Sequence, residues 1–447
     1  MNRSLPRTLT AVGAALATTV AGVVATVALA APATASNPTT PGDITGYGFD
    51  QCVAPTQRAM NKWLSHSPFL AVGIYTSGAS RGCRSQPNLT PTWVRKQLRK
   101  GWRLLPITLG PQAFCHPSFP RYGNDPVING NPGKKGKYGK ARKQGRAEAV
   151  TAVNAAKALG IVPTSTLWYD LEGFDITNTH CRESSLYFLH AWTKQIRSLG
   201  YVSGVYSSAG SGIKMLDDAR RQRPGTFVLP DRIWIARWDG IANTSTSYIA
   251  EDGWRPGGRM KQYRGGHKET WGGVTINIDS NFLDLGRGSV PARSATGCGT
   301  RIDFRSYKVL TPSRPRPRQL KALQCLLKSQ GLYGGKVNGK YTARTQAAVQ
   351  QFQTGRPGKV STTWTRRNWM QVHAVGPRPV VKFGSVGPAV RRLQRALNAA
   401  GAARLDVTGH FDKATDTALR AYQRKVGVSA NGVAAGPRWK VIAQGRR

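Results

Sequence analysis

The chain has 447 residues and a formal net charge of +44, from 65 Lys and Arg against 21 Asp and Glu. This length excludes a single small domain, because one hydrophobic core rarely serves so many residues, and we expect two or three domains. The positive charge excludes a strongly acidic chain and favours a polyanion as the binding partner.

The N-terminus has the features of a secretory signal peptide. Arg3 and Arg7 precede an apolar run from Leu9 to Ala30, and Ala33-Thr34-Ala35 forms an A-x-A cleavage pattern. We therefore expect residues 1–35 to be removed and the mature protein to begin near Ser36, with no further membrane span. An uncleaved anchor is the alternative, because the run is long enough to cross a bilayer.

Export affects which polyanion we expect as the partner. The sequence contains no nucleic-acid-binding motif, so we expect anionic polymers of a cell envelope and no nucleic acid. A basic surface that serves only solubility is the alternative.

The cysteines form an even set in an exported chain, which favours disulfides. No pair has C-x-x-C spacing, so we expect no zinc site. Six cysteines allow fifteen pairings. We expect each cysteine to pair with its neighbour in the sequence, which predicts Cys52–Cys83, Cys115–Cys181 and Cys298–Cys325.

Strand and helix patterns alternate between residues 44 and 285. The expected strands are Ile44–Asp50, Phe69–Thr76, Arg103–Leu109, Leu167–Glu172, Tyr201–Ser207, Arg232–Trp238, Arg259–Tyr263 and Val274–Leu283. The expected helices are Thr90–Lys100, Ala141–Leu159, Glu183–Leu199 and Ile213–Arg223. This alternation predicts an α/β fold, an irregular TIM-like barrel over residues 36–286 whose last strands lack helices. A doubly wound open sheet is the alternative.

A long Gly-, Pro- and Lys-rich segment, Pro111–Lys140, follows the third expected strand. Loops of this length are usually functional or disordered. In a barrel it would lie on the C-terminal face, where active sites form.

An internal repeat follows a Pro- and Arg-rich linker expected over residues 287–318. Leu323-Gln324 matches Leu393-Gln394 at an offset of 70 residues, and Trp369 matches Trp439 at the same offset. This period predicts two small helical modules, residues 319–374 and 382–447. From Arg316 onward, 25 Lys or Arg stand against three Asp, a net charge of +22. About half of the mature charge therefore lies on a segment without candidate catalytic carboxylates, and this separation of charge from chemistry is expected of an enzyme with an appended anchoring arm.

The segment Trp168-Tyr169-Asp170-Leu171-Glu172-Gly173 follows an apolar stretch and ends at glycine, which predicts the end of a buried strand. Because strand side chains alternate, Trp168, Asp170 and Glu172 share one face, with the two carboxyl groups roughly 7 Å apart. Such a pair is near the separations used in glycoside hydrolysis. A solvated strand end whose acids pair with arginines is the alternative.

The repeats resemble the peptidoglycan-binding module of bacterial cell-wall enzymes. The second copy carries the pattern as Val390, Leu393, Gln394, Leu397, Gly401, Val407, Gly409, Phe411, Thr415, Leu419 and Gln423, and the first copy matches it from Leu320 to Gln353. The resemblance implies three-helix modules that bind peptidoglycan.

Residues 44–286 resemble the glycoside-hydrolase-like domain of secreted actinobacterial proteins, a relative of the family 25 lysozymes. The matching segments are Gly46-Tyr47-Gly48-Phe49-Asp50, Trp168–Glu172, Trp234-Ile235-Ala236, Gln262-Tyr263 and Ile278-Asp279-Ser280-Asn281. The resemblance implies a barrel with acids at the ends of strands one, four and eight. It also implies that the acetamido group of the substrate can serve as the nucleophile.

A glycosidase needs one protonated carboxyl group and one charged one. We expect Glu172 to be the general acid, Asp170 its ionised partner, and Asp50 and Asp279 to polarise water or the acetamido group. Side chains at strand ends are candidates for sugar binding, with core packing as the alternative: Tyr75, Tyr206, Trp238, Gln262 and Tyr263. The histidines show no ligand spacing, so we expect no metal and no cofactor.

The sequence therefore predicts a secreted, cell-wall-associated, monomeric protein with lysozyme-type activity on the glycan strands of peptidoglycan. The alternative is a protein that binds the wall glycan without cleaving it.

Overall fold

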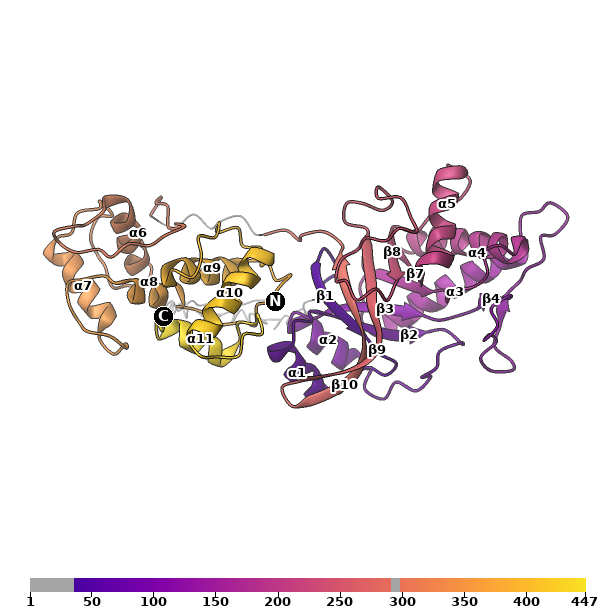
Figure 1. Cartoon of the computed structure of the whole chain (residues 1–447), viewed down its shortest axis with the longest axis horizontal. Coiled ribbons are helices and arrows are strands. Elements are labelled where there is room, and N and C mark those ends of the chain that lie inside the picture. The colour runs from indigo at the N-terminus through magenta and orange to yellow at the C-terminus, as the bar shows by residue number, and fades with distance from the viewer. Residues whose placement is uncertain (1–35, 291–297) are drawn as a thin grey trace, which may run out of the picture. The chain divides into compact units, whose positions relative to one another are not determined.

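Eight strands close into a barrel in the first part of the chain (Figure 1). The computed structural model describes residues 36–290 and 298–447, so the expected signal peptide lies outside the described residues. Around the barrel, the strand order is β1-β10-β9-β8-β7-β6-β3-β2. The strands are β1 (Thr45–Asp50), β2 (Ala71–Ser77), β3 (Arg103–Thr108), β6 (Thr166–Asp170), β7 (Val202–Ser208), β8 (Arg232–Ala236), β9 (Arg259–Trp271) and β10 (Val274–Asp284). The predicted irregular α/β barrel is confirmed.

The barrel closes through antiparallel strands. β10 pairs antiparallel with both β9 and β1, whereas the other neighbouring strands are parallel. Gly272 and Gly273 join β9 to β10 in a two-residue turn, and both have positive φ, at 60° and 76°. Such a turn needs positive φ at both positions and produces a hairpin. For this reason no helix separates the last two strands.

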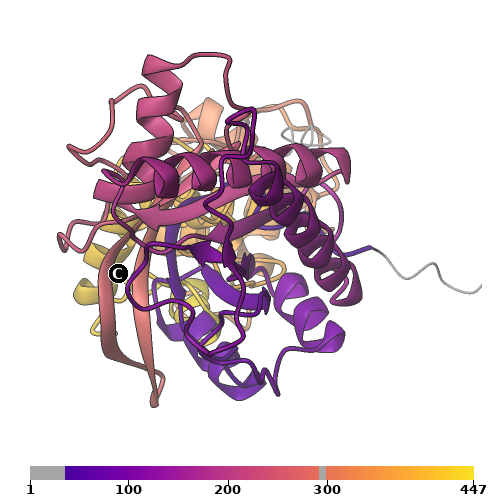
Figure 2. The ribbon, with the colours of Figure 1, turned by 90° about the vertical axis from the view of Figure 1, so that its right-hand side faces the viewer.

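Helices flank the strands (Figure 2). They are α1 (Gln57–His66), α2 (Pro91–Arg99), α3 (Gly139–Ala158), α4 (Thr179–Ser198) and α5 (Lys214–Gln222), and α3 packs along α4. The prediction omitted α1, although Thr56 caps its first turn and its buried residues have helical spacing. The long segment 111–140 contains a small parallel pair, β4 (Gln112–Ala113) and β5 (Val127–Ile128). A short π-helical turn, η1 (Ala209–Ile213), follows β7.

Alternation along β6 distributes its side chains as the sequence predicts. Trp168 is fully buried, and its ring meets the Trp234 ring edge-on at 5.6 Å. A Cβ on Gly204 of β7 would come within 2.4 Å of the Trp168 ring, so glycine makes room for the indole. Tyr169 instead packs against α4, with its ring 4.9 Å from that of Trp192.

The C-terminal part contains two three-helix modules. Module 1 consists of α6 (Pro317–Lys328), α7 (Ala343–Gln353) and α8 (Arg366–His373), and module 2 of α9 (Pro388–Ala400), α10 (Lys413–Lys425) and α11 (Gly436–Ala443). Their buried apolar residues form one continuous core. Tyr307 and Leu310 belong to this core. Part of the linker predicted over residues 287–318 is therefore packed rather than extended, because it carries apolar side chains.

Equivalent glutamines hold the loops of each module. The Gln324 side chain accepts from the backbone N–H of Gly339 and donates to the Lys340 carbonyl, at 2.9 and 3.0 Å. The Gln394 side chain does the same at Gly409 and His410, both at 3.0 Å. The repeated glutamines therefore stabilise the fold of the modules.

The three expected disulfides, Cys52–Cys83, Cys115–Cys181 and Cys298–Cys325, are present. Among the described residues, no helix is both long and apolar enough to cross a membrane.

Residues 37–447 form one compact unit. Within it, Lys382 at the start of module 2 is buried, and its Nζ donates to the carbonyl oxygens of Ser67 and Phe69, each at 2.8 Å. Two backbone acceptors thus compensate in part for the burial of this amine.

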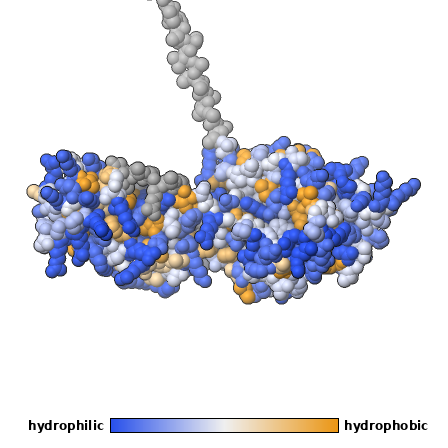
Figure 3. All heavy atoms as spheres, turned by 90° about the horizontal axis from the view of Figure 1, so that it is seen from above, coloured by the Kyte–Doolittle hydropathy of each residue, from blue (hydrophilic) through white to orange (hydrophobic). Residues whose placement is uncertain are grey.

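The face of the molecule that Figure 3 shows is largely hydrophilic.

Candidate active site

Four carboxyl groups converge at one end of the barrel. Asp50 ends β1 and Asp170 ends β6, with Glu172 two residues further on. Asp279 lies on β10, directly opposite Asp50 in the antiparallel ladder. A pocket of about 170 Å³ is lined by Asp50, Glu172 and Asp279, together with Tyr75 and other residues. The structure therefore brings the four predicted acids together.

A β-bulge directs Asp279 toward this pocket. The pairing of β10 with β9 shifts register on either side of Ser280, so Asp279 has no regular partner on β9. Bulges are frequent beside active sites, where they re-aim a side chain. Burial raises the pKa of Asp279, and the backbone N–H of Gly266, which hydrogen-bonds its carboxylate, opposes this rise.

Gln262 of β9 connects two of the acids to the pocket wall. Its Nε2 donates to Asp50 at 3.3 Å and to Asp279 at 3.4 Å. Its Oε1 accepts from the Tyr206 hydroxyl at 3.1 Å and from the Trp238 indole N–H at 2.9 Å. Both polar atoms of this buried amide are therefore hydrogen-bonded. These bonds fix the positions of the two acids and the two aromatic side chains relative to one another.

Asp50 is buried, and its surroundings favour the protonated form. Burial, followed by the charge of Asp279, raises the pKa of Asp50 to about 8. Asn281 and Gln262 donate hydrogen bonds to its carboxyl group and oppose this rise. The Asn281 amide is itself oriented by the Trp234 indole N–H, which donates to its Oδ1 at 2.8 Å.

Asp170 and Glu172 lie in different environments. Asp170 is 2% exposed, and burial, with the nearby charge of Glu172, raises its pKa well above the usual range. Its Oδ2 accepts from the Tyr75 hydroxyl at 3.3 Å. Glu172 is only partly buried and lines the pocket; burial also raises its pKa, but the Arg121 guanidinium lowers it. Burial therefore disfavours the ionised form of Asp170, which is the form that we expected from the sequence.

The sequence reasoning missed Gln112, which positions the end of β6. Its side chain is fully buried and donates to the Asp170 carbonyl at 2.8 Å, while its Oε1 accepts from the Glu172 N–H at the same distance. One side chain from the long segment 111–140 therefore fixes the backbone between the two acids. No local sequence signal reveals this, since 58 residues separate Gln112 from Asp170.

Arg121 is a second residue that the sequence reasoning missed. It comes from the same long segment and lines the acid pocket. Its positive charge opposes the rise in pKa that burial causes at Glu172 and at Asp170. The placement of this segment beside the acids agrees with the expectation that it lies on the C-terminal face of the barrel.

The five predicted sugar-binding side chains separate into two groups. Tyr75, Tyr206, Trp238 and Gln262 are hydrogen-bonded to the acids or to one another. Trp238 is 67% exposed and packs over Gly265, so its ring is available to a ligand. Tyr263 follows Gln262 on β9 and instead hydrogen-bonds Ser280. Strand alternation therefore takes Tyr263 away from the acid cluster.

Across residues 36–290 and 298–447, no group of three or more His, Cys, Asp or Glu is arranged to hold a metal ion. The carboxyl groups of the cluster can themselves transfer protons and stabilise charge.

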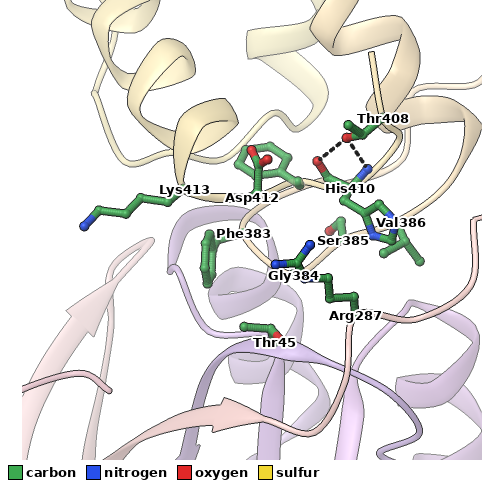
Figure 4. A pocket seen from close by; sticks show the side chains of 11 residues that line it. Thr45, Arg287, Phe383, Gly384, Ser385, Val386, Thr408, His410, Asp412 and Lys413 are labelled. Carbon is green, nitrogen blue, oxygen red and sulfur yellow. Dashed lines mark hydrogen bonds between the residues drawn. The ribbon is translucent and has the colours of Figure 1, made fainter. Parts of the chain in front are cut away.

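Another pocket, of about 210 Å³, lies where module 2 meets the start of β1 (Figure 4). Thr45 and Arg287 line it together with module residues that include Phe383 and His410. Its single carboxylate, Asp412, caps α10 by accepting from the N–H of Thr415. This pocket lacks paired acids, so it is a weaker candidate for glycosidic chemistry.

Comparisons with known proteins agree with this division of the chain. Residues 61–283 match the family model described as "Rv2525c-like, glycoside hydrolase-like domain". Residues 316–356 and 386–436 match the "Putative peptidoglycan binding domain". A comparison with the curated proteins found no match.

Two solved structures illustrate the similarity. The Tat-secreted protein Rv2525c of Mycobacterium tuberculosis, in complex with L-tartrate, is 13% identical, with a TM-score of 0.35 over 54% of this chain and 95% of that chain. A family 25 glycosyl hydrolase from Bacillus anthracis is 12% identical, with a TM-score of 0.33 over 57% of this chain and 94% of that chain.

Proposed function

Since the chain carries an Rv2525c-like, glycoside hydrolase-like domain followed by two peptidoglycan-binding domains, we propose that it is a secreted, wall-associated glycosidase. Its substrate would be the glycan strands of peptidoglycan, and the bond broken would be a glycosidic bond. The modules would hold the barrel on the wall, and their excess of positive charge would favour anionic wall polymers.

The convergence of Asp50, Glu172 and Asp279 in one pocket carries this proposal. Glycosidases use carboxyl groups whose surroundings hold one protonated and another charged. Burial raises the pKa of Glu172, and this residue is accessible from the pocket, which suits a general acid. Burial also raises the pKa of Asp279, but this residue is less buried than Asp50 and its backbone hydrogen bond opposes the rise, so we assign it as the ionised partner.

In the proposed reaction, Glu172 donates its proton to the leaving glycosidic oxygen as the bond to the anomeric carbon breaks. The acetamido oxygen of the substrate or a water molecule attacks that carbon, and Asp279 stabilises the positive charge that develops. Water finally supplies the new hydroxyl group, and its proton returns to a carboxylate of the cluster. Asp50 and Asp170, whose surroundings favour the protonated form, would act as hydrogen-bond donors at the base of the site.

Digestion of purified peptidoglycan by the mature protein tests the proposal, with soluble products identified by mass spectrometry. The wild type should release muropeptides with new reducing ends, and Glu172→Gln should release none. Glu251→Gln is the matched control, because Glu251 is an exposed carboxylate, 70% accessible, outside the pocket. This variant should retain full activity.

Absence of products from the wild type, together with retention of the protein on the same wall preparation, would contradict the glycosidase. It would favour the alternative, a protein that binds wall glycan without cleaving it. In that case Asp50→Asn and Asp170→Asn should weaken retention.

A further inference from the structure

A wide groove lies between the two helical modules, remote in sequence from the barrel acids. Its volume is about 620 Å³. Module 1 contributes Lys359, Ser361, Thr365 and Arg367, among others, and module 2 contributes Lys425 and Arg447. The lining contains four basic side chains and neither Asp nor Glu.

The two modules hold this groove in a defined shape. They share a continuous apolar core, and α8 of module 1 packs against α9 and α11 of module 2. Arg395 of α9 also forms a largely buried ion pair, at 2.6 Å, with Asp303, which precedes module 1. Packing of this kind resists separation of the modules, so the groove is a persistent feature of the surface.

The basic side chains of the groove have no carboxylate partner among residues 298–447. The few acids of the modules are engaged elsewhere: Asp406 pairs with Arg305, Asp416 pairs with Arg420, and Asp412 caps α10. Lys359, Arg367, Lys425 and Arg447 are exposed and form no ion pair with Asp or Glu. Their charges are therefore available to an external anion.

We propose that this groove binds a phosphodiester-containing polymer of the cell envelope. An arginine fork and lysine ammonium groups are the side chains that bind phosphate, and the Ser361 hydroxyl can donate a further hydrogen bond. A groove of this volume exceeds the needs of a single phosphate, whereas a polymer with one charge per repeat can meet several cations at once. Several weak contacts along one polymer chain together give a higher affinity than any single contact.

The lining argues against single-stranded nucleic acid as the occupant. Proteins that bind single strands combine basic side chains with aromatic rings on which bases stack. The residues that line this groove include no aromatic ring. This inference rests on the wall location in the proposed function, but it concerns a surface separate from the acid pocket and does not depend on cleavage of the glycan.

The test measures binding of the mature full-length protein to short synthetic poly(glycerol phosphate) by calorimetry. The groove variant combines Arg367→Gln and Lys425→Gln. Its matched control combines Arg404→Gln and Lys440→Gln, which removes the same charges from exposed side chains outside the groove. We expect the groove variant to bind about tenfold more weakly than the wild type, with the control within about twofold, at physiological ionic strength.

Three results would overturn the proposal. Equal weakening in both variants would mean that binding reflects diffuse charge. Equally tight binding of polygalacturonate would remove the preference for phosphodiester over carboxylate. Tighter binding of an oligothymidylate would indicate nucleic acid instead. Circular dichroism of both variants confirms that they fold, and no arm of the test depends on turnover.

Discussion

Asp50 and Asp279 are cross-strand partners in the antiparallel ladder between β1 and β10. Neighbouring acids repel each other when both are charged, and Asp50 is the more deeply buried of the two. These surroundings favour the protonated form of Asp50, while Gln262 bridges the pair through its amide nitrogen. This relationship arises only because the last two strands run as a hairpin.

Asp50 should make the stability of the barrel dependent on pH. Because its pKa rises to about 8 in the folded state, folded protein binds more protons than unfolded protein between about pH 4 and pH 8. The free energy of unfolding should therefore fall as pH rises through this window. Denaturant unfolding at both ends of the window should show this loss in the wild type and a smaller loss in Asp50→Asn. Equal losses in the two proteins would argue against a buried, protonated Asp50.

Arg121 should control the protonation of Glu172. Its positive charge lowers the pKa of that carboxyl group, so Arg121→Gln should raise the pKa of Glu172. Carbon-13 NMR titration of labelled glutamate measures this directly. Arg146→Gln, which removes an exposed arginine of α3, is the control and should leave the titration unchanged. An identical shift in both variants would mean that overall charge, rather than the position of Arg121, is responsible.

Gln394 should stabilise module 2 without contributing to wall binding. It is 1% exposed, and Gln394→Leu would leave the Gly409 N–H without a partner and the His410 carbonyl with only the Thr408 hydroxyl as donor. We expect a loss of roughly 2–3 kcal/mol in the free energy of unfolding. Thermal unfolding measures the loss, and Gln351→Leu, on an exposed face of α7, should cost much less. Retention of the folded variant on peptidoglycan should be unchanged; impaired retention would assign Gln394 to the ligand site.

The Cys298–Cys325 disulfide should stabilise the helical modules. It joins the segment that follows the barrel to α6, at a sequence separation of 27. Replacing both cysteines by serine should lower the free energy of unfolding by about 3 kcal/mol, because the unfolded chain regains freedom. Calorimetry of the full chain should show a lower transition temperature for the modules. An unchanged transition would show that the packing of Tyr307 and Leu310 is sufficient.

Much of the architecture could be read from local patterns. The period-two alternation predicted that Trp168 and Tyr169 point to opposite faces of their strand, and the 70-residue repeat predicted two equivalent modules; both were confirmed. Sequential pairing of the cysteines was also confirmed. The cysteines of each disulfide lie 27 to 66 positions apart and were paired only by their order in the sequence. The alternation and the repeat depend on neighbouring residues or on repetition along the chain. Local periodicity and spacing are sufficient for such features.

The assignment of roles within the acid cluster required the tertiary structure. The sequence placed Asp50, Asp170, Glu172 and Asp279 at strand ends, but burial and neighbouring charges decide which of them keeps its proton. Gln112 and Arg121 enter the site from a segment whose sequence shows only glycine, proline and lysine enrichment. Their roles come from contacts between distant parts of the chain, and no local pattern encodes those contacts. The sequence by itself therefore determined the strands, the repeats and the candidate acids, whereas the closure of the barrel decided their electrostatics.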